Sequence, residues 1–442
     1  FPKEGRMGLS RVFRLAVALL MAGSAPLALA QELSLLQWSH FVPRYDKWFD
    51  AWAEDWGEAN GFTVRVDHVN VAELPAALTA AIEAGEGPSI IEMVFPPTAF
   101  IEGLHPLNDV NEAAAAAHGE RTANCQATSY LPINDTYVGF THGYIPDPGD
   151  YQISLWADVG MPDGPSTWDE LYEGGLAVYR KHGVPVGIGL SPELDSRMAT
   201  RAVIWSHGGS VQDADENVVL NSTETIAAVE YYARLQNDAM TDEVFGWTAS
   251  SNNQGLIAGE LSYILNSISA YRSLQKIDEE AAADIGFVPA LAGPAGAFAS
   301  SHVWQIYVIP TYVQGAELEA AKKFILDHTA AYSDAVYNSE LYNFPCYPST
   351  VPELSGWLAD DPFGSQPADK LKVLETVNEW SVYIGYPGTA NPAVMQAFGE
   401  NLVVNMVARV AKGEQSAEES VAEAHARAEE IFADWRARGY LR

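Results

Sequence analysis

The chain has 442 residues, too many for one hydrophobic core, so we expect at least two domains. Its net charge of −33 repels nucleic acid and anionic membranes, which argues against both as partners. The hydrophobic content of 48% is ordinary for a globular protein, and no apolar stretch is long enough to predict a membrane-spanning helix.

Residues 1–30 have the pattern of a secretory signal peptide. Arg11 and Arg14 precede the apolar run 15–23, and Ala28-Leu29-Ala30 offers the small residues that signal peptidase accepts. Because no cysteine lies at this cleavage point, we expect no lipid anchor. The pattern predicts export to the periplasm, with a mature chain that begins at Gln31 and does not insert into the membrane.

The first part of the mature chain alternates strands and helices, which predicts a mostly parallel sheet with crossover helices. The predicted strands are 33–38, 62–66 and 89–95, and the predicted helices are 45–58 and 74–84. Trp48, Trp52 and Trp56 recur at helical spacing in the first of these helices. Such a stripe packs in a core more often than it forms a binding platform.

The alternation continues to the C-terminus without an internal repeat. Strands are predicted at 136–141, 187–190, 258–266 and 287–294, and helices at 223–238, 317–329, 392–412 and 416–438. A further helix is predicted to begin after Thr167, which forms a capping pattern with Glu170. Ser416 and Glu419 repeat that pattern at the start of the last helix.

The sequence contains no recognisable catalytic motif. The nucleophile elbow, the zinc-protease motif, the P-loop and the dinucleotide-binding loop are all missing, and the ten histidines are scattered. We therefore expect a protein that is not an enzyme and that uses neither a cofactor nor a metal ion.

Cys125 and Cys346 are the two cysteines of the chain. Export to an oxidising compartment would allow them to form a disulfide. Sequence spacing does not show whether they are close in space, so a bridge and two free thiols both remain open.

Seven short motifs follow one another along the mature chain. The most specific joins Gly160-Met161-Pro162 to Thr167-Trp168-Asp169-Glu170-Leu171. The others are a strand ending at Trp38 and the segments 84–91, 134–139, 255–261, 286–294 and 320–325. In this order they resemble the family 1 extracellular solute-binding proteins of ABC importers, the group that includes maltose-binding protein.

The chain departs from that family pattern at three places. Ser89 stands where the family usually has Asp, Asn266-Ser267 replaces a common Gly-x-Trp, and 300–304 replaces a Gly-Gly segment. These positions fall near the expected edges of the binding pocket. We therefore expect a ligand that is unusual for the family.

The resemblance implies an α/β fold of two lobes joined by a hinge, the type II periplasmic binding protein fold. Lobe 1 is expected to contain 31–139 and 290–332, and lobe 2 to contain 145–285 and 340–442, with hinges near 140–144, 286–289 and 333–339. Closure about these hinges would bury a ligand between the lobes, and the closed form would dock on the permease subunits of the importer.

A sugar or a polyol is the expected ligand, because aromatic plates and short polar side chains recognise its apolar faces and hydroxyl rims. The chain has 12 Trp and 20 Tyr. The candidate ligand-binding residues lie at strand ends or in polar loops: Trp38, Glu92, Trp205, Trp247, Asn253, Asn266, His302, Trp304, Tyr342 and Tyr386. Each could instead be an ordinary core or surface residue.

Two alternatives remain at this point. The same fold could bind a phosphorylated or sulfonated molecule through Arg197, Arg201 or Arg272, because such anions need a local positive charge. A secreted carbohydrate-active enzyme would instead use two carboxylates on either side of a scissile bond.

Overall fold

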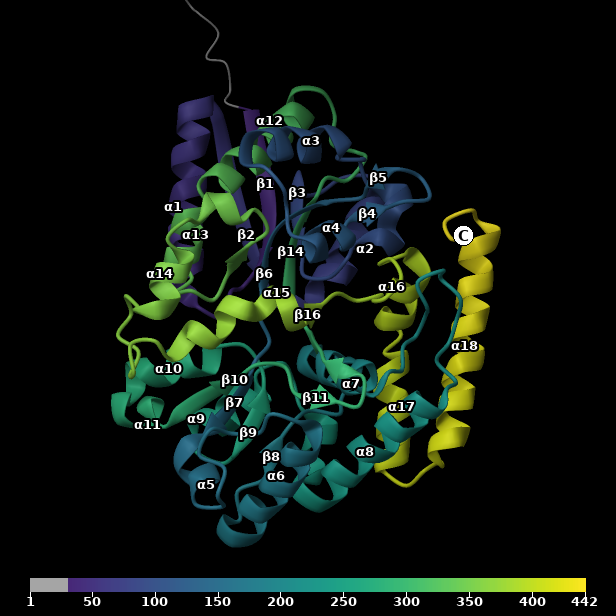
Figure 1. Cartoon of the computed structure of the whole chain (residues 1–442). Helices are drawn as coiled ribbons and strands as arrows, with labels where there is room; N and C mark the ends of the chain where they lie inside the picture. Colours follow the sequence, from purple (N-terminus) through teal and green to yellow (C-terminus); the bar gives the residue numbers. More distant parts are fainter. Residues whose placement is uncertain (1–30) are drawn as a thin grey trace, which may run out of the picture.

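The computed structural model describes residues 31–442, so the predicted signal peptide lies outside the described residues. Two β-sheets form the centres of two α/β lobes, one above the other in Figure 1. Each sheet has its own hydrophobic core. Within 31–442, no helix combines the length and the apolar character that crossing a membrane requires.

The larger sheet has six strands in the order β15-β6-β14-β3-β1-β2. Its strands are β1 (Gln31–Trp38), β2 (Phe62–Val69), β3 (Ile90–Met93), β6 (Phe140–Ile145), β14 (Val303–Val308) and β15 (Phe344–Pro345). β1 pairs in parallel with β2 and with β3, because the helices α1 (Pro43–Asn60) and α2 (Leu74–Ala84) make the crossovers between them. β14 runs antiparallel between β3 and β6, which places a late segment in the middle of the sheet.

The aromatic stripe of α1 packs against α12 (Gly315–Ala330). The Trp52 ring centroid lies 5.2 Å from that of Phe324 and 5.2 Å from that of His328. Trp56 lies 5.0 Å from Phe324. The stripe therefore fixes α1 and α12 on the larger sheet, and it belongs to the core.

The smaller sheet has four strands in the order β10-β7-β9-β8. They are β7 (Gly149–Gln152), β8 (Val186–Gly187), β9 (Tyr263–Leu265) and β10 (Ile285–Val288). The helices of this lobe are α5 (Ile153–Ala157), α6 (Trp168–His182), α7 (Leu194–His207), α8 (Thr223–Ala239), α9 (Ser251–Ile257), α10 (Ser269–Ile277) and α11 (Glu279–Ala283). Thr167 caps α6 as predicted, because its hydroxyl oxygen accepts the Glu170 N–H at 3.0 Å.

The chain passes between the lobes three times. The first passage is 146–148, between β6 and β7, and the second is 289–302, between β10 and β14. The second contains the short strands β11 (Ala292–Gly293), β12 (Gly296–Ala297) and β13 (Ala299–Ser300). β13 pairs in parallel with β16 (Ser381–Val382), where the third passage begins. The expected hinges at 140–144 and 286–289 fall mostly within β6 and β10, directly before the first two passages, and hinge motion stays a prediction.

The packing corrects the third expected hinge. Residues 333–339 lie mostly in α13 (Tyr332–Asn338), and buried residues of 341–380 share the core of the larger sheet. This part of the chain includes α14 (Leu354–Ala359), η5 (Lys370–Thr376) and α15 (Val377–Trp380). Because β15 joins the edge of the larger sheet, the chain after it is held against lobe 1. The assignment of 340–380 to lobe 2 is therefore wrong, and the third passage lies after residue 380.

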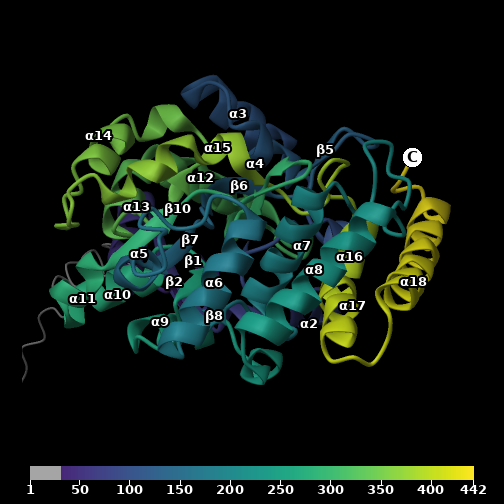
Figure 2. The same cartoon turned by 60° about the horizontal axis from the view of Figure 1, so that its bottom comes forward.

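The C-terminal helices lie along the side of both lobes (Figures 1 and 2). They are α16 (Pro392–Gly399), α17 (Leu402–Ala411) and α18 (Ala417–Ala437). The single helix predicted at 392–412 is divided, because Asn401 adopts a left-handed backbone with φ of 56°. The predicted capping box of Ser416 and Glu419 is present at the start of α18.

The structure settles the state of the cysteines. Cys125 of α4 (Ala123–Ala127) and Cys346, next to β15, form a disulfide that closes a sequence separation of 221 residues. Neighbouring elements are α3 (Asn108–His118), β4 (Tyr130–Leu131) and β5 (Thr136–Tyr137). Both cysteines belong to the core of the larger sheet, so the disulfide joins parts of lobe 1 and does not tie the two lobes together.

Candidate functional site

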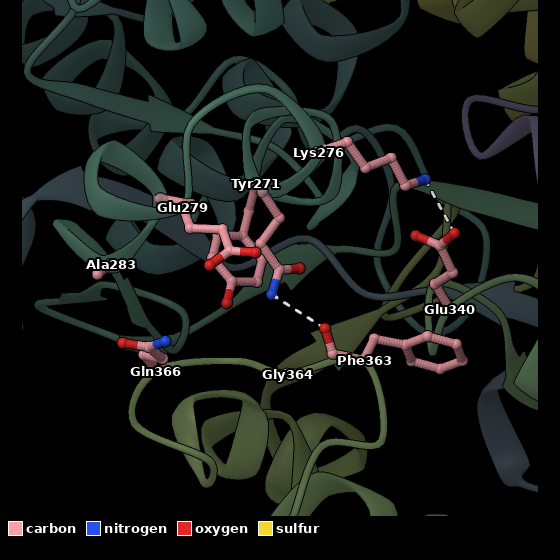
Figure 3. Close-up of a pocket in the computed structure, with 10 residues that line it drawn as sticks. Tyr271, Lys276, Glu279, Ala283, Glu340, Phe363, Gly364 and Gln366 are labelled. Atoms are coloured by element: carbon pink, nitrogen blue, oxygen red, sulfur yellow. Dashed lines mark hydrogen bonds and ion pairs between the residues drawn. The ribbon is translucent and has the colours of Figure 1, made fainter.

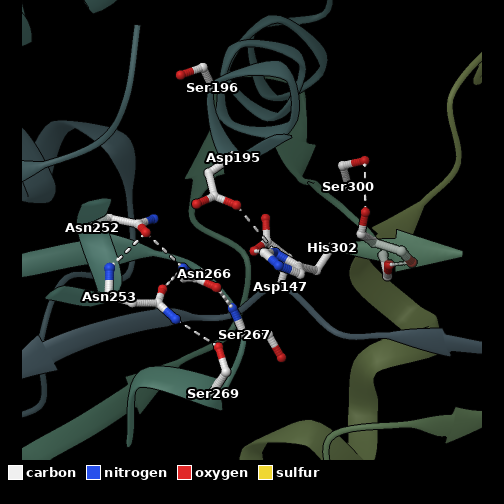
Figure 4. Close-up of polar contacts among 12 residues, drawn as sticks. Asp147, Asp195, Ser196, Asn252, Asn253, Asn266, Ser267, Ser269, Ser300 and His302 are labelled. Atoms are coloured by element: carbon white, nitrogen blue, oxygen red, sulfur yellow. Dashed lines mark hydrogen bonds and ion pairs between the residues drawn. The ribbon is translucent and has the colours of Figure 1, made fainter. Parts of the chain in front are cut away.

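Buried polar side chains gather where the two lobes meet (Figure 4). Asp147 lies in the first passage between the lobes, His302 ends the second, and Asp195 is in the first turn of α7. We call the group the seam cluster; its members are Asp147, Asp195, Asn252, Asn253, Asn266, Ser267, Ser269, His302 and Tyr342. Because they come from both lobes and from the passages, a ligand held here would be enclosed by the closed protein.

One imidazole lies beside two carboxylates in the seam cluster. His302 Nδ1 is 3.3 Å from Asp147 Oδ1 and 3.7 Å from Asp195 Oδ1. Burial raises the pKa of Asp147, and the His302 contact opposes this shift. Burial also raises the pKa of Asp195 well above its usual range, and the negative charges of Glu193 and Asp147 add to the shift. The site is therefore one in which carboxylate charge is poorly compensated by the chain.

Several buried polar atoms of the seam cluster have few or no hydrogen-bond partners among residues 31–442. Within this range Asp147 Oδ2 and His302 Nε2 have no partner, whereas the Asp195 carboxylate has only Asn252 beside it and the Tyr342 hydroxyl only Ser267 and Ser269. Buried polar groups in proteins are nearly always paired, so these atoms make the seam cluster the candidate ligand site. Donors and acceptors both occur among them, which suits a ligand with several polar groups.

The asparagine side chains of the cluster are bonded mainly to one another. Asn266 Nδ2 donates to Asn252 Oδ1 at 3.0 Å, and Asn253 Nδ2 donates to Ser269 Oγ at 3.0 Å. The Ser267 N–H donates to Asn266 Oδ1 at 2.6 Å. Asn253 and Asn266 are two of the predicted ligand-binding residues. They position Ser269 and Ser267, which follow β9 in the chain.

Aromatic rings lead from the end of β1 to the seam cluster. The ring centroids of Trp38 and His40 are 4.8 Å apart, and those of His40 and Tyr342 are 5.0 Å apart. Phe41 lies 6.4 Å from His302. β1 is a central parallel strand, and ligands of α/β sheets lie beyond the carboxyl ends of such strands. The structure thus brings Trp38, Asn253, Asn266, His302 and Tyr342 of the predicted set into one region.

Three other predicted residues lie outside the seam cluster, although Glu92 contacts Trp38 from within the larger sheet. Glu92 is buried in the larger sheet, where its Oε1 is 3.0 Å from His142 Nε2. Trp304 lies on β14 with its ring 5.7 Å from that of Tyr144. Trp247 is half-buried against the core of the smaller lobe. No described hydrogen bond or ring contact joins any of the three to the seam cluster.

Trp205 and Tyr386 come together at a different place. Their ring centroids are 6.3 Å apart, and both line a cavity of about 350 Å³ beside the third passage. The lining of this cavity contains no residue of the seam cluster. These two predictions therefore identified a real pair of neighbours, but the pair lies outside the site proposed here.

A second cavity, of about 390 Å³, opens along the boundary between the lobes (Figure 3). Tyr271, Lys276 and Glu279 line it from the smaller lobe, and Glu340 and Phe363 line it from the larger one. Lys276 Nζ lies 2.8 Å from Glu340 Oε1 across this boundary. Polar contacts therefore connect the two lobes at this edge.

The three arginines considered for an anionic ligand are engaged elsewhere. Arg272 forms an ion pair with Asp361, with two N···O distances of 2.7 and 3.0 Å. The guanidinium groups of Arg201 and Arg197 lie over the Phe398 ring, 4.3 and 4.9 Å from its centroid. The structure therefore gives no support to a phosphate or sulfonate site built on these residues.

Sequence reasoning missed the two carboxylates of the cluster. Asp147 lies between two prolines directly after a buried strand, which is a signal that could have identified it. Asp195 follows Glu193, whose side chain caps α7, so the sequence resembles an ordinary helix start. Two of the departures from the family pattern, at Asn266-Ser267 and at His302, fall in the seam cluster.

Comparisons with known proteins agree with the fold. The model of the bacterial extracellular solute-binding protein family matches residues 51–362, which is more than half of the chain. No curated protein matches the sequence.

Among solved structures, the maltose-bound MalE3 of T. maritima has a TM-score of 0.75 at 18% identity, and the match covers 91% of this chain and 100% of that one. A solute-binding protein of Thermotoga lettingae bound to α-D-tagatose has a TM-score of 0.74 at 17% identity, with coverages of 91% and 100%. One from Agrobacterium radiobacter in complex with ribitol has 0.69 at 15%, with coverages of 91% and 98%. The fold is the two-lobe α/β fold of the periplasmic binding proteins.

Proposed function

This chain belongs to the bacterial extracellular solute-binding proteins, and we propose that it captures a sugar or a polyol between its lobes and delivers it to the permease of an ABC importer. The family consists of binding proteins outside the cytoplasm, and we place this member in the periplasm, in keeping with the predicted signal peptide. Bound maltose, tagatose and ribitol in proteins of the same fold support this class of ligand.

The observation that carries the proposal is the set of buried polar atoms in the seam cluster that have few or no described partners. A sugar has many hydroxyl groups, each able to donate and accept hydrogen bonds. His302 Nε2, Ser267 Oγ and the Tyr342 hydroxyl would bond these groups, and the oxygens of Asp147 and Asp195 would accept from them. The described residues leave Asp147 Oδ2 and His302 Nε2 without a partner and bond the other groups only to one another, so a polyhydroxylated ligand would supply the hydrogen bonds that are missing.

The rings beside the cluster would provide the apolar half of the site. Trp38 and Phe41 are 5.4 Å apart between ring centroids, and Phe41 faces His302. Aromatic rings pack against the C–H faces of sugars, while polar groups fix their orientation. Asn253 and Asn266 act as positioning residues, and we do not include Glu92, Trp205, Trp247, Trp304 or Tyr386 in the proposed contact set.

Closure links binding to transport. A ligand shifts the protein toward the closed state only if it binds that state more tightly than the open one. Atoms of the seam cluster come from both lobes, so they surround a ligand together only when the lobes are closed. Contacts such as the hydrogen bond from the Tyr271 hydroxyl to Ser365 Oγ, 2.8 Å long, also form between the lobes. The closed shape is what a permease would recognise.

The test is a thermal-shift and calorimetric screen of the purified protein with monosaccharides, disaccharides and polyols. A ligand at 100 times its dissociation constant adds about 2.7 kcal/mol to the free energy of unfolding, which raises the melting temperature by several degrees. Tyr342→Phe should weaken the ligand found in this screen by about 2- to 10-fold, because one hydrogen bond is lost. Tyr337→Phe is the matched control, since Tyr337 is exposed on α13.

Two results would contradict the proposed function. One is that no sugar or polyol raises the melting temperature or gives heat of binding. The other is that the protein consumes the sugar, which chromatography of the recovered ligand would reveal.

A further inference from the structure

The seam cluster contains buried carboxyl groups that have no full counter-charge on the described chain. Within residues 31–442, no lysine or arginine forms an ion pair with Asp147, Asp150 or Asp195. His302 is the one basic side chain in contact, and its Nδ1 is shared by Asp147 and Asp195. Both carboxylate oxygens of Asp150, on β7, are also buried and unpaired. Removing several carboxylates from water without a counter-charge is costly, so this arrangement requires an explanation.

The acidic groups are not isolated features, because buried neutral polar groups lie among them. His302 Nε2 is fully buried without a described hydrogen-bond partner, and the buried Ser267 and Tyr342 hydroxyls lie beside one another. Tyr342 and His302 belong to the larger lobe and its passage, whereas Ser267 follows β9 of the smaller sheet. Figure 4 shows Asp195 directed toward Asp147 and His302. Hydrogen-bonding groups and buried carboxyls thus lie together in one enclosed place.

A neutral sugar would satisfy the hydrogen bonds and leave these carboxyls in the protonated form that burial favours, whereas a cation would pair with their ionised form. Hydroxyl groups donate one hydrogen bond each, whereas a protonated amine donates three and carries a full positive charge. Hydrogen bonds between an ammonium and a carboxylate are about twice as strong as neutral ones. Burial, together with Glu193 and Asp147, raises the pKa of Asp195, and a bound cation would reverse this effect by favouring the ionised form.

We propose that the ligand carries a protonated nitrogen beside its hydroxyl groups, as an amino sugar or an amino polyol does, with the nitrogen held by Asp195 and Asp147. The inference rests on the proposed function, because it assigns the chemical class of the ligand in the same cleft. Ser267, His302 and Tyr342 bond the neighbouring hydroxyl groups in this arrangement.

The test compares matched ligands by titration calorimetry on the purified protein at pH 7. Each set contains an amine, its hydroxyl parent and its N-acetyl derivative: glucosamine, galactosamine and mannosamine with glucose, galactose and mannose, and 1-amino-1-deoxysorbitol with sorbitol. In at least one set we expect the amine to bind at least 10-fold more tightly than both partners. This comparison uses the unaltered protein, so it stands even if a variant fails to fold.

The variant Asp195→Asn tests whether Asp195 causes the preference for the amine. It should remove most of the 10-fold preference, because the amine loses its anionic partner whereas the hydroxyl parent loses at most one hydrogen-bond acceptor. The ligand-free variant should also melt at a higher temperature than the unaltered protein, because an uncompensated buried carboxylate is gone. Asp163→Asn is the control, since Asp163 is an exposed carboxylate on the surface of the smaller lobe.

The outcomes separate the two proposals. If neutral sugars or polyols bind as tightly as their amines, the inference on the nitrogen is overturned and the proposed function stands. If the preference for the amine survives in Asp195→Asn, the assignment to these carboxylates is overturned. If no member of any set binds, the inference is overturned, and the sugar-binding function is overturned as well when the wider screen with disaccharides and other polyols also finds no ligand.

Discussion

Arg272 of α10 and Asp361 of the larger lobe form a two-pronged ion pair that is almost completely removed from solvent. The N···O distances are 2.7 and 3.0 Å, and the side chains are 1% and 0% exposed. Arg272 Nε also donates to the Glu340 carbonyl oxygen at 2.9 Å. α10 packs with the smaller sheet, whereas Asp361 follows α14, so the pair connects the two lobes across their boundary.

Breaking this pair should strongly destabilise the closed protein. Arg272→Ala leaves the Asp361 carboxylate buried without its counter-charge, and such changes cost about 3–5 kcal/mol. Urea denaturation followed by circular dichroism measures the loss. The double variant Arg272→Met with Asp361→Asn should recover most of it, because neither partner is then charged. Equal losses in the single and double variants would show that the loss does not come from the unpaired charge of Asp361.

Reduction of the Cys125–Cys346 disulfide should destabilise lobe 1. The bond closes a loop with a sequence separation of 221 residues, so opening it increases the entropy of the unfolded chain. We expect a loss of about 2–4 kcal/mol in the free energy of unfolding for Cys125→Ser with Cys346→Ser. Because both cysteines lie in one lobe, ligand affinity should change by less than 3-fold. A large loss of affinity at temperatures where the variant is folded would contradict this placement.

The Glu92–His142 pair should make stability depend on pH. Burial raises the pKa of Glu92 from its usual 4.5 to about 8, and it lowers the pKa of His142 to about 3. The folded protein therefore keeps the proton on Glu92 up to about pH 8, whereas the unfolded chain releases it near pH 4.5. The stability that Glu92 contributes is complete below pH 4.5 and is lost as the pH rises toward 8.

Glu92→Gln isolates this effect. Relative to the unaltered protein, the variant should gain free energy of unfolding between pH 5 and pH 8, by up to about 1.4 kcal/mol per pH unit. His142 acts in the opposite direction below pH 6.5, so the comparison is between the two proteins at each pH. Urea denaturation at four pH values measures it, with Glu58→Gln on the exposed face of α1 as the control. Parallel curves for the variant and the unaltered protein would show that Glu92 is ionised in the fold.

The asparagine network and the serine beside it should respond differently to mutation. Asn266→Ala removes the partners of Asn252 and of the Ser267 N–H, and unpaired buried groups cost about 1–3 kcal/mol of stability each. Ser267→Ala removes a single hydroxyl beside Tyr342, so stability should fall by at most about 1 kcal/mol while ligand affinity falls by about 2- to 10-fold. Thermal denaturation and calorimetry on both variants separate the two roles. Equal effects on stability would contradict this division.

Local patterns in the sequence determined most of the elements and the fold class. The predicted helix at 223–238 and the strand at 33–38 agree with α8 and β1, because the period of apolar residues directly reflects which face is buried. The motif order also identified the family correctly. The split of 392–412 into two helices was missed, since a left-handed residue such as Asn401 has only a weak local signal.

The composition of the site was decided by the tertiary structure. Asp147, Asp195, Ser267 and Tyr342 are distributed over nearly 200 residues, and only the three passages between the lobes bring them together. Residue type alone could not separate Glu92, which His142 pairs within a core, from Asp195, which nothing on the chain pairs fully. The assignment of 340–380 to lobe 2 was wrong for the same reason, because contacts with distant segments hold this part of the chain against lobe 1. Periodicity tells which residues are buried, but packing partners and charge compensation depend on contacts between segments that are far apart in the sequence.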